Sequence, residues 1–193
     1  VLTGAGGTFC SGADLGAIGR GSPNRLAADG DGPMGPTRLE TRKPVVAAVE
    51  GYAVAGGLEL AIWCDVRVAA RNAVFGVFCR RWGVPLIDGG TVRLPRLIGE
   101  SRAMDMVLTG RAVEADEAAA MGLVNRLSEP GEALADAVAL AARIASFPAT
   151  CVAVDRASVR RSASLPIHEA LRAEFESAAP AIADMAPHVE RFV

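Results

Sequence analysis

The stretch GYAVAGGLELA, residues 51–61, follows an apolar strand-like run and combines a glycine pair with the start of a helix that carries one carboxylate, Glu59. A second glycine-rich turn, CSGADL at residues 10–15, also follows a short apolar run. Glycine lets the backbone approach a ligand closely, and a helix N-terminus attracts negative charge, so amides at two such turns can stabilise one developing anionic oxygen. An acid/base group beside such an anion hole predicts an enzyme, with Glu59 as the leading candidate for its chemistry.

Strand-like and helical patterns alternate on both sides of these turns. Short aliphatic runs predict buried parallel strands at residues 1–3, 45–49, 66–69 and 123–127. Helical patterns occur at residues 58–64, 101–108 and 115–121, and the last two are expected to end at Gly110 and Gly122. Because strands alternate with helices, the sequence predicts an α/β fold, and 193 residues are enough for one domain with a sizeable core.

Two segments depart from this alternation. Residues 16–37 are rich in Gly, Pro, Asn and Asp, which predicts an irregular loop, and a loop of this length is usually either mobile or functional. After Gly131 the pattern is helical, with expected helices at residues 132–145, 151–160 and 167–179 separated by Pro148, Pro166 and Pro180. These helices are amphipathic, so their apolar faces are expected to pack on the domain, on each other or on another subunit.

Composition and missing motifs exclude several classes of protein. A net charge of -2 gives no electrostatic reason to expect nucleic acid or an anionic membrane as a partner. The four cysteines are widely scattered without nearby histidines, so neither a metal site nor a disulfide framework is expected. No signal peptide or bilayer-spanning run is recognisable, which makes a cytoplasmic location the simplest expectation. His168 and His188 lie far in sequence from both glycine turns, which argues against a Ser/His/Asp triad.

Several motifs in a fixed order carry a resemblance to a known family: FCSGADL at 9–15, GYAVAGGLELA at 51–61, the pair Cys64-Asp65, and GRAVEADEAAAMGL at 110–123. Over essentially its whole length the chain resembles the crotonase family, also called enoyl-CoA hydratase/isomerase. The resemblance implies a crotonase-type spiral of ββα turns in residues 1–127 and a C-terminal helical trimerisation region in residues 128–193. It also implies further strands before Val1, and assembly as a homotrimer or dimer of trimers.

The same resemblance implies an acyl-CoA substrate, with coenzyme A as part of the substrate and no separate cofactor or metal. Ala13 and Gly56 would supply the two backbone N–H groups of an oxyanion hole for the thioester carbonyl. Glu59 would be the acid/base, with its pKa raised by the apolar residues around it. Enoyl-CoA hydration, a lyase reaction of fatty-acid metabolism, is the default for the family. Double-bond isomerisation, acyl-CoA decarboxylation, a non-catalytic acyl-CoA-binding scaffold and a purely structural trimeric partner remain as alternatives.

Cys79 marks a departure from the family pattern, because hydratases carry a second catalytic glutamate at this position. A thiol cannot take over that role without a large change in pKa and reach, so Cys79 is expected to line the acyl pocket. Asp88 is a candidate for a replacement catalytic carboxylate, although an aspartate in a glycine-rich turn equally often bonds its own backbone. Arg80 and Arg81 could bind a substrate carboxylate or the phosphates of coenzyme A, or could simply be solvated.

The remaining candidates for substrate binding are Gly12, Asp14 and Gly57, which lie inside the two glycine turns. Asp14 directly follows Ala13, and an aspartate at such a position is also expected to cap the next helical turn.

Overall fold

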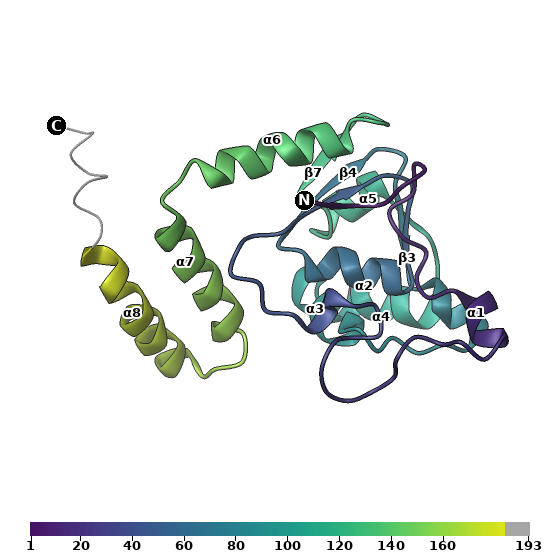
Figure 1. Cartoon of the computed structure of the whole chain (residues 1–193), viewed down its shortest axis with the longest axis horizontal. Helices are drawn as coiled ribbons and strands as arrows, with labels where there is room; N and C mark the ends of the chain where they lie inside the picture. Colours follow the sequence, from purple (N-terminus) through teal and green to yellow (C-terminus); the bar gives the residue numbers. More distant parts are fainter. Residues whose placement is uncertain (184–193) are drawn as a thin grey trace. The chain divides into compact units, whose positions relative to one another are not determined.

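The computed structural model describes residues 1–183, which belong to two compact units (Figure 1). The first unit consists of Val1–Thr41 and Val45–Ala139, and the second of Arg42–Pro44 and the residues from Leu140 onward. The first unit thus continues beyond residue 127, and the domain boundary expected there stays a prediction. His188 lies outside the described residues.

Two small sheets form the framework of the first unit. One sheet is parallel, with the strand order β1 (Leu2–Thr3), β2 (Val46–Val49), β4 (Val66–Ala70) and β7 (Arg126–Ser128). In the other, β3 (Tyr52–Val54) runs parallel to β5 (Val74–Gly76), and β5 pairs antiparallel with β6 (Val113–Glu114). From β2 to β5 the strands therefore alternate between the sheets, because β2 and β4 lie in the first and β3 and β5 in the second. This mixed α/β architecture confirms the predicted fold class.

Helices fill the connections between these strands. They are α1 (Leu15–Gly19), α2 (Gly56–Trp63), α3 (Gly90–Ile98), α4 (Glu100–Thr109), α5 (Ala115–Ala120), and the 3-10 turns η1 (Pro36–Arg38) and η2 (Phe78–Trp82). The helices predicted at 58–64, 101–108 and 115–121 are confirmed as α2, α4 and α5, and Gly110 ends α4 in the left-handed conformation. Helix α3 was not predicted, because Pro95 lies inside it and its first residue belongs to a glycine pair that is typical of a turn.

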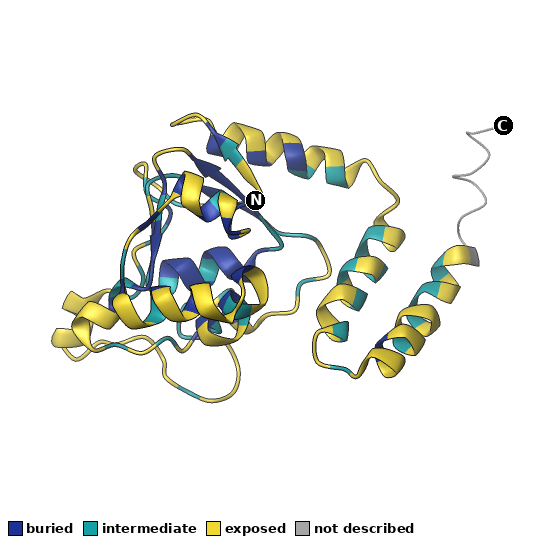
Figure 2. Ribbon diagram, turned by 180° about the vertical axis from the view of Figure 1, so that it is seen from behind, coloured by how far each residue is buried: buried dark blue, intermediate teal, exposed yellow. Residues whose placement is uncertain are grey.

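Helix α2 is the most deeply buried helix of the first unit (Figure 2). It is apolar on nearly all sides, and such a helix is stable only inside a core. Its neighbours in that core include fully buried large side chains, each of which stabilises the fold by about 1.5–3 kcal/mol: Phe75, Leu94, Met106 and Leu123. Arg67, which is 2% exposed, donates hydrogen bonds to the carbonyls of Cys64 and Leu123 and so fixes the C-terminal end of α2.

The C-terminal part of the described chain is helical, with α6 (Ala133–Ala145), α7 (Ala149–Ser162) and α8 (Ile167–Ala183). Helix α7 packs against α8 and has no fully buried residue (Figure 2). The three predicted helices are confirmed, but the prediction that Pro180 ends the last one is wrong, because Pro180 lies inside α8. A proline inside a helix removes one backbone N–H donor, and α8 nevertheless continues past Pro180 to Ala183, the last described residue.

No single helix among residues 1–183 is long and apolar enough to cross a bilayer, although α6 and α7 together, as a bent pair, have the required length and composition.

Candidate active site

The two glycine turns predicted from the sequence lie against each other. The carbonyl of Cys10 accepts a hydrogen bond of 3.0 Å from the N–H of Val54, which joins the first turn to the strand before the second. A Cβ atom at Gly12 would lie only 2.9 Å from the backbone nitrogen of Gly56, so the approach depends on glycine. The structure thus brings the two turns together at the N-terminus of α2.

The N-terminus of α2 presents unpaired backbone amides. Ala55 caps the helix with φ 54° and ψ -126°, and it is the one non-glycine residue with positive φ within residues 1–183. Such a conformation costs about 1–3 kcal/mol and persists only where the surroundings enforce it. Here the N–H of Ala55 donates to the carbonyl of Gly76, and its own carbonyl accepts from Leu58. Neither Gly56 nor Ala13 uses its N–H in a hydrogen bond with any residue of the described chain.

Glu59 lies in the first turn of α2 and is 2% exposed. Its Oε1 accepts hydrogen bonds of 2.8 Å from the N–H groups of both Asp88 and Gly90. Gly90 is the first residue of α3, so the carboxylate stands at the N-terminal, electropositive end of that helix. Burial raises the pKa of Glu59, the backbone bonds from Gly90 and Asp88 oppose this rise, and the charge of Asp88 adds to it. The net effect is a raised pKa, which suits a group that shuttles protons.

The hydrogen bonds to Glu59 are concentrated on one of its two oxygens. Within residues 1–183, Oε1 accepts the hydrogen bonds described for this carboxylate. A further backbone N–H, that of Ile87, also favours the charged form of this carboxyl group, though less than those of Gly90 and Asp88.

Asp88 is 3% exposed and is hydrogen-bonded to the segment at residues 16–37, for which the sequence predicts an irregular loop. Its Oδ1 accepts hydrogen bonds from the N–H of Met34, at 3.0 Å, and from the hydroxyl of Thr37. Gly32 and Gly35 exchange two backbone hydrogen bonds, which closes residues 32–35 into a tight turn. Sequence reasoning missed Met34 and Thr37 as site residues, since nothing in the local pattern marks either one.

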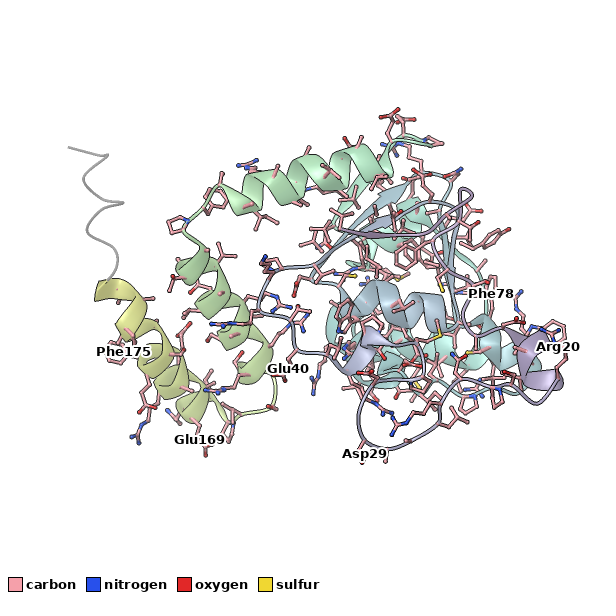
Figure 3. All side chains as sticks on the ribbon, viewed as in Figure 1. Arg20, Asp29, Glu40, Phe78, Glu169 and Phe175 are labelled. Carbon is pink, nitrogen blue, oxygen red and sulfur yellow. The ribbon has the colours of Figure 1, made fainter. Side chains whose placement is uncertain are left out.

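Met34 also contacts the second glycine turn. A Cβ atom added to Gly56 would lie 2.8 Å from the sulfur of Met34 and 3.3 Å from Cα of Gly12. The segment predicted as an irregular loop, residues 16–37, contains most of α1 and the start of η1, so that prediction is wrong at both ends. Its last part, residues 32–37, reaches the site. The outer part of this loop includes the exposed residue Asp29 (Figure 3).

Cys79 lies in η2 and is buried. Burial, and then the negative charge of nearby Glu59, raise the pKa of its thiol, so Cys79 is protonated at neutral pH and unsuited to act as a nucleophile.

The arginines after Cys79 are held by the end of α4. Arg80 is exposed, and its Nε donates to the carbonyl of Val107. Arg81 donates to the carbonyl of Gly110, and its Cζ lies 3.8 Å from the ring centre of Phe78. No contact described within residues 1–183 joins Arg80 to Glu59 or to the glycine turns, and its role in substrate binding stays a prediction.

Two further residues of the glycine turns have structural contacts. Asp14 caps α1, because its Oδ1 accepts a hydrogen bond of 3.0 Å from the N–H of Ala17, and the expected cap is confirmed. Gly57 allows a close approach, since a Cβ atom there would lie 1.9 Å from the carbonyl oxygen of Cys10. A role for either in substrate binding stays a prediction. Within residues 1–183 there is no group of three or more His, Cys, Asp or Glu side chains that could hold a metal ion.

Sequence comparison identifies relatives of the whole described chain. The model of the enoyl-CoA hydratase/isomerase family matches residues 1–184. Enoyl-CoA hydratase EchA19 of Mycobacterium tuberculosis is 38% identical over 179 residues, which cover 89% of this chain and 66% of that protein. The short-chain-enoyl-CoA hydratase of Clostridium acetobutylicum is 37% identical over 182 residues, covering 92% of this chain and 69% of that protein. With other curated relatives the shared part is 52% or 48% of their length.

Solved structures agree with these matches. The crystal structure of enoyl-CoA hydratase EchA1 from Mycobacterium marinum superposes with a TM-score of 0.89 at 38% identity, covering 98% of this chain and 76% of that one. An enoyl-CoA hydratase from Mycobacterium tuberculosis gives a TM-score of 0.90 at 36% identity, with coverage of 98% and 75%. The chain therefore belongs to the enoyl-CoA hydratase/isomerase, or crotonase, family.

Proposed function

We propose that this chain carries the active site of an enoyl-CoA hydratase, in which Glu59 is the acid/base and the amides of Ala13 and Gly56 bind the thioester oxygen. The observation that carries the proposal is the position of Glu59. Its carboxyl group has a raised pKa, and it lies one helical turn after Gly56, whose N–H has no partner within residues 1–183. The relatives named as hydratases support the choice of reaction.

In the proposed reaction, the two amides donate to the carbonyl oxygen of a 2-enoyl-CoA and make the β-carbon electrophilic. Water adds its oxygen to the β-carbon, and the carbonyl oxygen takes up the negative charge of an enolate. One well-placed donor of this kind contributes about 2.7–4 kcal/mol of transition-state stabilisation. Glu59 accepts the proton that the water loses and supplies a proton to the α-carbon, so the net change is addition of H and OH across the double bond.

Double-bond isomerisation is the second candidate, and Cys79 favours it. We infer that Cys79 stands where a hydratase would carry its second glutamate, and a protonated thiol cannot take a proton from water. One glutamate can still move a proton between the α- and γ-carbons of an enoyl-CoA. The decarboxylase alternative rests on Arg80 or Arg81. Arg80 already donates to the carbonyl of Val107 and Arg81 to that of Gly110, so this alternative has less support.

The test is a turnover assay with 2-enoyl-CoA and with 3-enoyl-CoA. We expect the chain to hydrate 2-enoyl-CoA, and we expect Glu59→Gln to lower kcat by about 100- to 10,000-fold while acyl-CoA binding is retained. Glu100→Gln is the matched control, because Glu100 also lies in the first turn of a helix but is exposed. Turnover of 3-enoyl-CoA alone would favour the isomerase. Tight binding without turnover of either substrate would favour a non-catalytic scaffold.

The proposal extends to assembly and location. A homotrimer or dimer of trimers that uses the C-terminal helices, and a cytoplasmic location, remain predictions, as does chemistry without a metal or separate cofactor. Light scattering of the purified protein would give its oligomeric state.

A further inference from the structure

Asp88 is linked to three parts of the site at once. Its N–H donates to Oε1 of Glu59, at 2.8 Å. Its Oδ1 accepts from the N–H of Met34 and from the hydroxyl of Thr37. Its carbonyl accepts a hydrogen bond of 2.8 Å from Nη1 of Arg93. One residue therefore joins the proposed acid/base to the loop at residues 32–37.

Arg93 also links Asp88 to the loop, because it donates hydrogen bonds to both. While its Nη1 holds the carbonyl of Asp88, its Nη2 donates to the carbonyl of Thr37, at 2.7 Å. Thr37 is 0% exposed, and a Cβ atom at Gly32 would lie 2.7 Å from Oδ1 of Asp88, so the loop is packed tightly on this carboxylate. Buried hydrogen bonds to a charged group are strong, and removing one partner leaves the other buried and unsatisfied.

The loop held in this way reaches the proposed oxyanion hole. The side chain of Met34 lies against Gly56, where a Cβ atom would come within 2.8 Å of the sulfur. Release of the loop would therefore free the surface of Gly56, and a shift of Asp88 would also move the N–H that fixes Glu59. A displacement of about 1 Å at a reacting group can lower a rate by about 100-fold.

We propose that Asp88 is a positioning residue: its carboxylate anchors residues 32–37 over Gly56, and its backbone N–H orients Glu59, without any proton exchange with the substrate. The kinetic part of this inference rests on the proposed function, whereas the anchoring of the loop does not. The alternative is that Asp88 acts directly on the substrate through its other oxygen, Oδ2.

Two substitutions at position 88 separate these roles. Asp88→Asn keeps an oxygen that can accept from Met34 and Thr37 but removes the ability to exchange a proton, and Asp88→Ala removes both. We expect Asp88→Asn to keep kcat within about fivefold of the parent and Asp88→Ala to lower it by about 100-fold. Equal, large losses for both variants would mean that Asp88 acts on the substrate and would overturn the inference.

Thr37→Val provides a second test that leaves Asp88 intact. Removal of the hydroxyl takes one donor from the carboxylate, so we expect a loss of kcat between those of the two Asp88 variants. An unchanged kcat would contradict the anchoring role. Ser128→Ala is the matched control, because it removes a hydroxyl that donates to another carboxylate, Asp136, and we expect it to leave kcat unchanged.

Amide hydrogen exchange measures the loop without any substrate. We expect the backbone amides of Gly32, Met34, Gly35 and residue 37 to exchange faster in Asp88→Ala and Thr37→Val than in the parent, and to stay protected in Asp88→Asn and Ser128→Ala. Equal protection in Thr37→Val and the parent would overturn the inference. If the parent turns over neither enoyl-CoA, the proposed function fails, yet this exchange pattern still decides whether Asp88 anchors the loop.

Discussion

Helices α2 and α3 both begin in the candidate active site, but the first backbone N–H group has a hydrogen-bond partner in only one of them. At α3, the N–H of Gly90 donates to the carboxylate of Glu59, so the chain itself supplies the anion. At α2, the N–H of Gly56 has no partner within residues 1–183. A helix N-terminus carries unpaired donors and partial positive charge, which favour an anion. The difference suggests that the protein fixes its base with one helix end and keeps the other for an oxygen of the substrate.

The largest effects are expected from the two adjacent glycines that begin α2. In Gly57→Ala the new Cβ would meet the backbone carbonyl of Cys10, which cannot move cheaply, so we expect loss of the folded state in thermal melts. In Gly56→Ala the new Cβ would meet the flexible end of Met34, so we expect a folded protein. Its kcat/KM should fall by about 10- to 100-fold, because the donor is displaced rather than deleted. A Gly56→Ala variant as active as the parent would contradict the role of this N-terminus.

Glu59→Gln tests the N-terminus of α3, where the N–H of Gly90 donates to Glu59, through the stability of the protein. Because burial raises the pKa of Glu59, the folded chain keeps this proton to a higher pH than the unfolded chain does. The resulting stabilisation is fully present below the usual glutamate pKa of about 4.3 and is lost as the pH rises through the raised pKa. We expect the melting temperature of Glu59→Gln, relative to the parent, to increase between about pH 4 and about pH 8. A constant difference across this range would mean that the pKa of Glu59 is not raised.

A smaller change is expected from Ala55→Gly at the N-terminus of α2. Glycine adopts the positive φ of Ala55 without strain, so we expect the free energy of unfolding to rise by about 0.5–1 kcal/mol. Ala53→Gly is the control, because it places glycine in a regular strand and should lower stability instead. Denaturant titrations of both variants measure the effect. Destabilisation by Ala55→Gly equal to that of Ala53→Gly would show that Ala55 is not strained.

The smallest effect concerns the thiol of Cys79, which reports the charge of Glu59. Since the negative charge of Glu59 raises the pKa of this thiol, Glu59→Gln should increase its thiolate fraction. We expect alkylation of Cys79 at about pH 8 to become a few-fold faster in the variant, as measured by mass spectrometry of peptides. Cys151, exposed on α7, provides the internal reference. An unchanged ratio of the two rates would mean that no charged carboxylate stands near Cys79.

The parts of the fold that could be predicted are those with a long, uniform local signal. The aliphatic runs at residues 45–49 and 66–69 are typical of buried parallel strands, and the structure has β2 and β4 there. Strands β3 and β5 have only three residues each, too few for a periodic pattern. Helix α3 was hidden by its internal Pro95.

Some residues of the candidate site could likewise be predicted from the sequence, and others could not. Glu59 and the glycine turns were found because the chemistry and the sequence motif coincide within a few residues. The hydrogen bond between Thr37 and Asp88 joins positions 51 residues apart, and the sequence around neither residue indicates it. Such contacts depend on how β2, α2 and α3 bring distant loops together, so only the structure reveals them.

The central claim is that the N-terminus of α2 binds the thioester oxygen of the substrate. Its most direct test is a crystal structure of the Glu59→Gln variant with a bound 2-enoyl-CoA. We expect the thioester oxygen to lie within about 3 Å of the backbone nitrogens of both Ala13 and Gly56, with the side chain at position 59 beside the α- and β-carbons. A thioester oxygen bound to only one of these amides, or to neither, would contradict the proposed active site.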